Sequence, residues 1–382
     1  MDLTPSDEQR LLRESADRFV NETYTADHRR RIANDPLGFS AEIWKRFAEL
    51  GWLALPIPES HGGLGGGAVE IGILMEAFGR GLVPEPYLST VVIGAALVGE
   101  CGSAAQKRTL LPAIADGSLY LAFAHSERAA RFDLAEVTAS AKKTPEGWVL
   151  NGRKTAVLDG GAAQQIIVSA RIGADNGAAG KICLFLVPAN APGLTKRDFP
   201  RLGGGRACNL DLRDVRLAAD ALLGDGTDVL PAIEAVVDRA MAALGAEAVG
   251  IMQTLLDQTL EYTKIRKQFG QPLSANQVIR HRLADMAMNC DEARSMALRA
   301  ALMADAEPVA RSRAASGAKA KIGKCARFVA EQSVQLHGAM GVTEELDIGS
   351  YFKRLLAFDT LFGGSAYHYR RHAALGGKTL QT

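Results

Sequence analysis

The middle of this chain constrains its fold more than any other feature, because it is strand-like while both flanks are helical. Within residues 119–227, short runs rich in β-branched or aromatic residues are separated by Gly, Pro and Asp clusters. These runs are LYLAFAH, EGWVLNG, QQIIVSARI, KICLFLVP and CNLDLRDVRL. They predict a β-domain that lies between two helical regions.

The N-terminal flank carries recognisable helix start and stop signals. Ser6 and Gln9 form a capping-box pattern ahead of an amphipathic run. Residues 40–50 place their apolar side chains on one side and are followed by Gly51, a common helix stop. The pattern predicts short helices in this part of the chain.

Long alanine-rich helices are expected from about residue 228 onward. Apolar side chains recur there at spacings of three and four, which is typical of a helical bundle. We therefore expect an α+β chain with an N-terminal helical domain at 1–118, a middle β-domain at 119–227 and a C-terminal helical bundle at 228–382.

Composition excludes several classes of protein. The formal net charge of +1 over 382 residues gives no sign of binding to nucleic acid or to an anionic membrane. The most apolar stretch, 240–252, is interrupted by Glu247, and the polar N-terminus MDLTPSDEQR is unlike a signal peptide. The five scattered cysteines have no metal-binding or disulfide spacing. We expect a cytoplasmic protein with no metal, nucleic-acid or membrane partner.

Two glycine-rich motifs are best interpreted as turns. Gly63-x-Gly65-x-x-Ala68 is similar to a dinucleotide-binding fingerprint, but the prolines of the preceding LALPIPESH are incompatible with the buried strand that this motif requires. The glycines at 203–205 lie inside the β-region and predict a hairpin connection.

The strongest local signal is RKQFGQPLSANQ, residues 266–277, which joins two long helical segments. Arg266 offers a planar fork for pyrophosphate oxygens. Phe269 could pack on an adenine ring, and Gln277 could hydrogen-bond to it. The alternative is a solvated turn with one buried phenylalanine, and the residues alone leave both interpretations open.

A second signal is QLHGAMGVTEE, residues 335–345. Its small residues Gly338, Ala339 and Gly341 would allow a ligand phosphate to approach the backbone closely. The alternative is a helix end followed by a loop.

In this order and within a helix–β–helix layout, the two signals resemble the C-terminal signatures of the acyl-CoA dehydrogenase family. PESHGGLGGG, LNGRKTAVLDGG and LRDVRL are similar to family segments at matching places, so the resemblance covers essentially the whole chain. It implies the family fold, with a β-barrel-like middle domain and a C-terminal four-helix bundle. EAFGR, YFKRL and the FGG ending look most like the small subunit of pimeloyl-CoA dehydrogenase and the paired subunits that desaturate CoA-linked steroid side chains.

The resemblance implies an FAD enzyme that desaturates an acyl-CoA thioester and passes electrons to an electron-transfer flavoprotein. It also implies a homo- or heterotetramer, the latter with a paralogous subunit. The residues that it places near the flavin dinucleotide are Arg266, Phe269 and Gln277 of the first signal, Gln335 and Ala339 of the second, Ser365 in place of a threonine, and Ser126 in a segment similar to T-E-P-x-x-G-S-D.

The family positions of the catalytic base are empty in this sequence. The usual glutamate lies in a segment resembling Y-E-G-T, and the aligned residues are Phe362, Gly363, Gly364 and Ser365. A second family position aligns with Ala240, which cannot accept a proton either. In the β-domain, the family tryptophan, threonine and serine near the flavin align with Ala156, Leu158 and Phe132.

Two hypotheses account for the missing base. In the first, a partner subunit supplies the β-domain and the base, and this chain supplies only the C-terminal helices of a shared site. In the second, Glu247 is a displaced base, since it lies on the apolar stripe of Ala240, roughly 10.5 Å further along the helix. We favour the first hypothesis and a structural role for Glu247, paired with an arginine at a helix interface.

Three further titratable residues, Asp238, Asp359 and His368, are interpreted as solvated or capping residues. Two alternative functions stay open. One is a non-catalytic subunit that only completes a partner's site. The other is a flavoenzyme of the same fold with different chemistry, such as thioester desulfination or nitroalkane oxidation.

Overall fold

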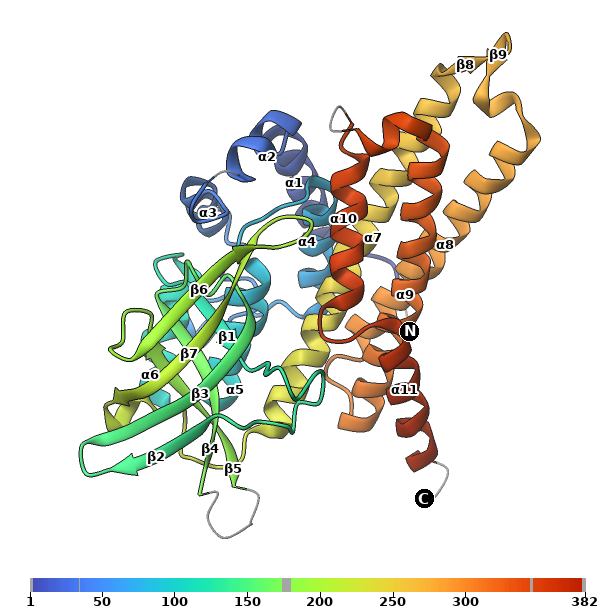
Figure 1. Cartoon of the computed structure of the whole chain (residues 1–382). Coiled ribbons are helices and arrows are strands. Elements are labelled where there is room, and N and C mark those ends of the chain that lie inside the picture. Colours follow the sequence, from blue (N-terminus) through green and yellow to red (C-terminus); the bar gives the residue numbers. More distant parts are fainter. Residues whose placement is uncertain (1–2, 34, 174–179, 344–345, 380–382) are drawn as a thin grey trace.

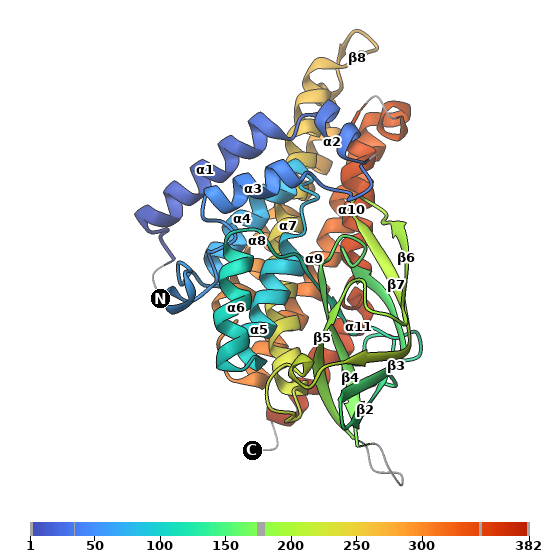
Figure 2. The same ribbon diagram turned by 90° about the vertical axis from the view of Figure 1, so that its left-hand side faces the viewer.

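The computed structural model describes residues 3–33, 35–173, 180–343 and 346–379 of the chain (Figure 1). It confirms the expected α+β fold, in which helices come first, a curled sheet follows, and long helices form the rest of the chain. Figure 2 shows the sheet on one side of the long helices and the N-terminal helices packed beside both.

The N-terminal region is built from short helices. The predicted capping box is present, because Ser6 Oγ accepts from Gln9 N–H and the Gln9 side chain accepts from Ser6 N–H. Ser40 caps the helix predicted at 40–50. The helices are α1 (Asp7–Thr23), α2 (Ala26–Ala33), α3 (Ala41–Glu49), η1 (Glu59–His61), α4 (Ala68–Gly81), the π-helical η2 (Tyr87–Ala95), α5 (Ala96–Cys101) and α6 (Ala104–Ala115).

The middle region is one seven-stranded sheet in the order β1-β4-β2-β3-β7-β6, with β5 paired to β4. All five predicted strand segments are strands, and the glycines at 203–205 connect β6 to β7 as expected. The strands are β1 (Leu121–Ala124), β2 (Ser140–Thr144), β3 (Gly147–Leu158), β4 (Gln165–Ile172), β5 (Lys181–Pro188), β6 (Leu194–Pro200) and β7 (Arg206–Leu217).

The β3–β7 ladder is irregular between Lys154 and Val157. There the backbone of Ala156 has a φ of +52°, and its N–H donates at 3.0 Å to the side-chain oxygen of Asn209 in β7 instead of to a backbone carbonyl. Irregularities of this kind redirect side chains. This one turns Thr155 and Ala156 toward the interdomain cavity described below.

The C-terminal region is a bundle of long helices. It contains α7 (Leu230–Ile265), the β8–β9 hairpin (Lys267–Gln268 and Gln271–Pro272), η4 (Leu273–Ala275), α8 (Gln277–Leu302), α9 (Pro308–His337), η5 (Gly338–Val342), α10 (Ile348–Thr360) and α11 (Ser365–Thr379). Figure 1 shows the hairpin extending beyond the other elements at the far end of α7 and α8.

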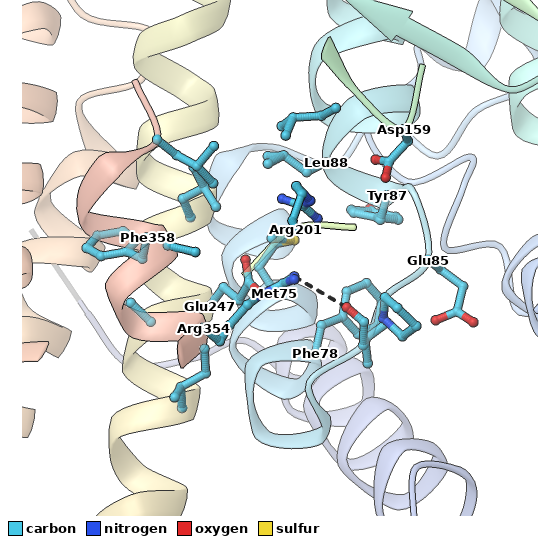
Figure 3. A pocket seen from close by; sticks show the side chains of 18 residues that line it. Met75, Phe78, Glu85, Tyr87, Leu88, Asp159, Arg201, Glu247, Arg354 and Phe358 are labelled. Atoms are coloured by element: carbon cyan, nitrogen blue, oxygen red, sulfur yellow. Dashed lines mark hydrogen bonds and ion pairs between the residues drawn. The ribbon is translucent and has the colours of Figure 1, made fainter. Parts of the chain in front are cut away.

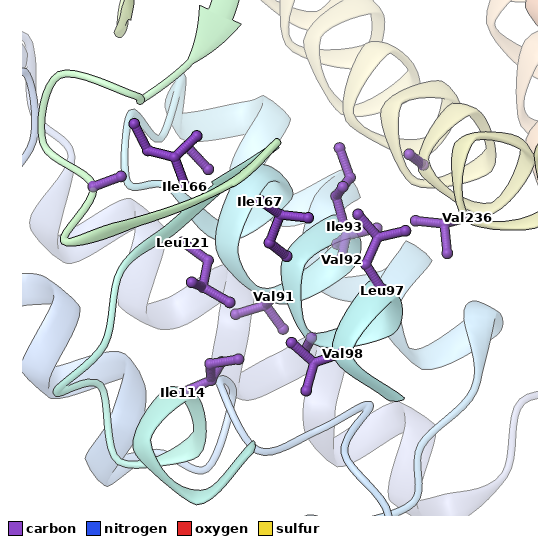
Figure 4. Close-up of a cluster of buried hydrophobic side chains, with 14 of the residues drawn as sticks. Val91, Val92, Ile93, Leu97, Val98, Ile114, Leu121, Ile166, Ile167 and Val236 are labelled. Atoms are coloured by element: carbon purple, nitrogen blue, oxygen red, sulfur yellow. The ribbon is translucent and has the colours of Figure 1, made fainter. Parts of the chain in front are cut away.

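A continuous hydrophobic core joins the N-terminal helices, the sheet and the start of α7 (Figure 4). Val92 of η2 and Val98 of α5 pack in this core with Leu121 of β1, Ile167 of β4 and Val236 of α7. Because these elements share one core, their relative positions are set by close packing.

Helices α4 and α7 approach each other closely through two glycines. A Cβ at Gly79 would lie 2.0 Å from the carbonyl oxygen of Glu247, and one at Gly250 would lie 1.9 Å from that of Glu76. Only glycine permits this contact.

In the described part of the chain, no helix is both long enough and apolar enough to cross a membrane.

Glu85, in the turn between α4 and η2, makes the stability of the fold depend on pH. Its carboxyl group is buried, accepts from Tyr24 Oη at 2.5 Å and from Ser40 N at 3.3 Å, and has its pKa raised by burial to about 7. The unfolded chain titrates near 4.5, so the folded state holds the extra proton between these values. The free energy of unfolding therefore falls as pH rises from about 4.5 to about 7.

We expect Glu85→Gln to remove this dependence, which corresponds to about 3 kcal/mol for the shift from 4.5 to about 7. The measurement is denaturant unfolding at pH 5 and pH 8 for both proteins. An equal loss of stability in the variant and the wild type across this range would contradict the assignment.

Candidate functional site

A cavity of about 540 Å³ lies between the sheet, α7 and α11. Its apolar wall includes Ile93 of η2, Val237 and Met241 of α7, and Leu361 and Phe362 of the turn after α10. Loop 125–136 and the irregular part of β3 form the opposite wall. This is the place where the sheet and the bundle can both contact one ligand.

The turn after α10 carries the empty base position and has no room for a side chain there. Gly363 has a φ of +112°, and an added Cβ would lie 2.6 Å from Tyr367 Cδ1 and 2.9 Å from His368 Nε2. The first turn of α11 therefore occupies the space that a side chain at 363 would need.

A buried lysine holds this turn from behind. Lys319 of α9 donates from Nζ to the carbonyl oxygens of Gly363 at 2.9 Å and Asp359 at 3.3 Å, and its ammonium lies 4.4 Å from the ring centre of Phe358. Burial lowers the pKa of Lys319 to about 8, and the charge of Asp359 opposes this shift. The lysine stabilises the turn without reaching the cavity.

The interpretation of His368 as a solvated or capping residue is wrong, because α11 packs this residue into the interior with 1% exposed surface. Its Nε2–H donates to the carbonyl oxygen of Phe362 at 2.9 Å. Its Nδ1 is buried and has no hydrogen-bond partner in the described part of the chain. Burial, followed by the charge of Lys319, lowers the pKa of His368 to about 4, so the ring is neutral at pH 7.

The other two titratable candidates have different outcomes. Asp359 accepts from the Ser365 N–H at 3.2 Å and the Ser365 hydroxyl at 2.8 Å, so its interpretation as a capping residue is confirmed and Ser365 begins α11. Asp238 is buried, not solvated or capping, and accepts from Arg311 and Arg371 at 3.2 and 3.1 Å. Two arginines from other helices compensate its charge, which the sequence did not indicate.

The β-domain wall of the cavity carries few side chains suited to a flavin ring. Ser126 and Ala156 are exposed at the cavity, and no large aromatic ring takes the place of the family tryptophan at Ala156. Phe132 lies at the rim, where its carbonyl oxygen accepts from Tyr367 Oη at 3.1 Å and its ring centre is 5.4 Å from that of Tyr367. This contact links the sheet loop to α11.

A buried polar network supports the same wall. Lys154 of β3 donates from Nζ to Glu127 Oε1 at 2.8 Å and Ser169 Oγ at 2.9 Å. His125 contacts Ser169 Oγ at 2.9 Å and the Leu134 carbonyl at 3.1 Å. Burial lowers the pKa of Lys154 to about 8 and that of His125 to about 4. The network fixes both ends of the loop that carries Ser126.

Glu247 lies outside this cavity, in a smaller one of about 40 Å³ between α4, α7 and α10 (Figure 3). Its Oε1 is 2.7 Å from both Nε and Nη2 of Arg354. The carboxyl group is buried, and Arg354 also donates to the carbonyl oxygen of Gly204 at 3.3 Å. The expected arginine partner at a helix interface is thus present.

A second hollow, of about 500 Å³, lies at the far end of α7. It brings together Arg266, Gln335 and Ala339, three of the predicted cofactor residues. Tyr262 and His337 line it as well, with their rings stacked at 4.3 Å. The hollow thus combines Arg266 of the first signal with Gln335 and Ala339 of the second, while its aromatic residues Tyr262 and His337 were not among the predicted cofactor residues.

The other two residues of the first signal lie beside this hollow and are not part of its lining. Gln277 begins α8 with an exposed side chain. Phe269 is at the hairpin tip with a φ of +50° and 100% of its surface exposed. The alternative of a turn with one buried phenylalanine is therefore wrong within this single chain. Phe269 is thus an apolar ring that the rest of this chain does not cover.

Sequence reasoning missed the residues that complete these sites from distant elements. Tyr367 blocks the base position, Lys319 holds the turn, and Arg354 neutralises Glu247. Arginine, lysine and tyrosine are common on helices, and no local pattern marks these three. The one signal available in the sequence was the glycine pair 363–364, since a glycine pair before a helix suggests close packing.

Comparison with known proteins gives three family matches in chain order. The descriptions are "Acyl-CoA dehydrogenase, N-terminal domain" over residues 6–118, "Acyl-CoA dehydrogenase, middle domain" over 122–215, and "Acyl-CoA dehydrogenase, C-terminal domain" over 230–374. The "Probable acyl-CoA dehydrogenase YngJ" of Bacillus subtilis (strain 168) is 33% identical over 347 residues, covering 89% of this chain and 90% of that protein.

Two similar solved structures are described as complexes or paired gene products. The "Tcur3481-Tcur3483 steroid ACAD" structure has 30% identity and a TM-score of 0.88, covering 98% of this chain and 99% of that chain. The ChsE4-ChsE5 complex from Mycobacterium tuberculosis has 26% identity and a TM-score of 0.87, covering 100% of both chains.

Proposed function

This chain belongs to the acyl-CoA dehydrogenase family, and from that premise we propose that it is one subunit of a heteromeric enzyme that introduces a 2,3-double bond into a CoA thioester. Members of the family are flavin-dependent oxidoreductases that act on CH–CH bonds. In the proposed enzyme, this chain contributes the hollow at 262–282 and 335–340 to a flavin held by the partner's β-domain. The partner supplies the base.

The observation that carries the proposal is the blocked position at Gly363. A proton acceptor must reach the carbon next to the thioester carbonyl, and the family's usual side chain cannot be built there without moving Tyr367 and His368. The second family position, Ala240, is fully buried and apolar. The chain's own cavity therefore lacks both customary carboxylates, while its projecting hairpin is intact.

The spacing of the two sites supports sharing. Met241 lines the cavity and Tyr262 lines the far hollow, and the two are separated by roughly 30 Å along α7. Phe269 is fully exposed, and it belongs to the β8–β9 hairpin that extends beyond the other elements (Figure 1). A dinucleotide that contacts both a cavity and a far hollow would therefore contact the cavity of one subunit and the hollow of another.

The residues of the far hollow fit FAD better than those of the cavity do. Arg266 provides an exposed guanidinium for a pyrophosphate, and no atom lies within 4 Å of the Cβ position at Gly338, which leaves room beside the backbone. When bound, FAD would accept the hydride from the β-carbon of the thioester. The role of this chain there is to hold the adenosine diphosphate part with Arg266, Phe269, Gln277, Gln335 and Ala339.

Within this proposal, Ser126 and Ser365 belong to the cofactor position of the chain's own cavity. Ser126 is exposed at the cavity, whereas the Ser365 hydroxyl donates its hydrogen bond to Asp359. The resemblance to paired steroid-type subunits and to the small subunit of pimeloyl-CoA dehydrogenase supports a heterotetramer. An electron-transfer flavoprotein is the proposed electron acceptor, and fatty-acid or steroid catabolism the proposed context.

Co-purification tests the shared site. We expect the chain expressed alone to contain little flavin and to show no flavin bleaching with an acyl-CoA. Co-expression with a paralogous subunit should yield a yellow complex that an acyl-CoA bleaches. If the single chain binds flavin and an acyl-CoA bleaches it, the shared-site proposal is wrong. A complex that is yellow, but whose turnover does not change when Arg266 is replaced by alanine, would assign this chain to a purely structural role.

A further inference from the structure

A short exposed segment at the rim of the cavity connects the sheet to α11. Residues 128–133 lie in the loop between β1 and β2, and we call them the strap. Five of the six residues line the cavity, and all except Ala130 are exposed. Val237 and Met241 of α7 line the same cavity, yet only 5% and 3% of their surface is exposed. The wall that faces the strap is thus well shielded from water.

Buried hydrogen bonds anchor the residues on both sides of the strap. Before the strap, the Glu127 carboxylate accepts from Lys154 Nζ at 2.8 Å and from the Ala139 N–H at 3.0 Å. After the strap, the carbonyl oxygen of Leu134 accepts from His125 Nε2 at 3.1 Å. The strap can therefore move only as a short loop between two fixed points.

The middle of the strap is fastened to α11 through Phe132. Tyr367 Oη donates to the Phe132 carbonyl oxygen at 3.1 Å, and the centres of the two rings are 5.4 Å apart. Among the described residues, this is the one hydrogen bond or ion pair that joins the strap to an element outside its own loop. One hydrogen bond and one ring pair contribute little compared with a packed core, so this contact can open while the core stays folded.

The backbone beside this contact is strained. Arg131 has a φ of +52°, a conformation that residues other than glycine adopt at a cost in free energy. The side chains of Arg128 and Arg131 have no hydrogen-bond or ion-pair partner in the part of the chain that the structure describes. The contact at Phe132 is therefore what holds the strained conformation, and release of the contact would relieve the strain.

We propose that the strap acts as a lid on the chain's own cavity, closed by the contact between Phe132 and Tyr367 and opened by its release. In the closed state the strap keeps solvent and solutes away from the apolar wall formed by Val237 and Met241. In the open state the same wall becomes accessible. This inference is independent of the proposed function, because it concerns entry to the cavity and neither the base nor the flavin.

Thiol labelling at the cavity wall measures the opening. Val237→Cys places a thiol of similar size on the wall that the closed strap shields. The full-length chain with this substitution is treated with N-ethylmaleimide, and peptide mass spectrometry gives the labelling rate at position 237. The native Cys101 is partly exposed and lies outside the cavity lining, so its labelling rate in the same sample is an internal reference for unfolding.

Two variants weaken the contact from opposite sides. In the Val237→Cys background, Tyr367→Phe removes only the hydroxyl group, and it should raise the labelling rate at position 237 relative to Cys101 roughly two- to tenfold. Phe132→Ala removes the ring and should raise the rate by a similar factor. Tyr369→Phe is the matched control, because Tyr369 is an exposed tyrosine of α11 outside the cavity lining. It should leave the rate unchanged.

Relative labelling rates that stay the same in Tyr367→Phe and Phe132→Ala would overturn the lid. Labelling at position 237 as fast as in the urea-unfolded chain, with the contact intact, would overturn it as well. Each variant tests the lid by itself, so a folding defect in one of them, seen as faster labelling of Cys101, leaves the other to decide. Flavin bleaching in the co-purified complex is recorded separately, since a failed lid leaves the shared site standing and a failed shared site leaves the lid standing.

Discussion

Replacing Gly363 with glutamate will not give this chain a working base, and it will destabilise the C-terminal region by about 2–5 kcal/mol. The estimate combines the strain of a side chain at a φ of +112° with the overlap between its Cβ and Tyr367, 2.6 Å away. The carboxylate can be accommodated only if α11 or the turn moves. Such a movement would break the bond from His368 to Phe362 and that from Lys319 to Gly363.

The next residue provides a matched control. A Cβ at Gly364 would have Asp359 O at 3.5 Å as its nearest neighbour, which is ordinary contact. Gly364→Ala should therefore change the free energy of unfolding by about 1 kcal/mol or less. Gly363→Ala should cost much more than Gly364→Ala in denaturant unfolding. Acyl-CoA turnover by Gly363→Glu in the absence of a partner would contradict the prediction.

Replacing Arg354 with methionine is expected to cost about 3–5 kcal/mol, because it leaves the Glu247 carboxylate buried without its partner. Only 8% of the Glu247 side chain and 14% of the Arg354 side chain are exposed, so water compensates little. Arg354 also connects α10 to the β6–β7 turn through Gly204. The measurement is the free energy of denaturant unfolding of the variant and the wild type.

A double variant and a neutral variant complete this test. Glu247→Met together with Arg354→Met should be less destabilised than the sum of the two single variants, because no charge is then left unpaired. In the co-purified complex, Glu247→Gln should leave the turnover per folded enzyme unchanged. A loss of turnover of 100-fold or more with normal folding would instead make Glu247 the displaced base.

The limits of sequence reasoning are clearest in the sheet. The five predicted strands have apolar runs, and all are present. The strands β2 and β6 were missed, because SAKKT and LTKRDFP are polar and largely exposed. Their stability comes from ladder pairing with β3 and β7, the longer strands that follow them in two hairpins. Strand propensity describes each segment by its own residues, whereas a polar edge segment becomes a strand through the backbone hydrogen bonds that its hairpin partner provides.

The interpretation of two titratable residues, Asp238 and His368, failed for a related reason. Asp238 was taken as solvated or capping, but Arg311 and Arg371 reach it from α9 and α11. His368 was interpreted in the same way and is buried against the turn before α11. A charged or polar residue on a helix becomes buried when partners from other helices compensate it, and such partners are scattered in the sequence.

The sequence alone determined the order of helices, sheet and bundle, the family, and the absence of a carboxylate at Gly363 and Ala240. The order of the elements follows from residue type and from spacing along the chain, which local chemistry dictates. The family and its two base positions follow from the resemblance of the sequence to segments of other family members. Only the tertiary structure decided that Tyr367 and His368 fill the base position, that Arg354 pairs with Glu247, and that Phe269 is exposed. Each of these depends on which residues distant in the sequence come into contact, or fail to do so, when the whole core packs.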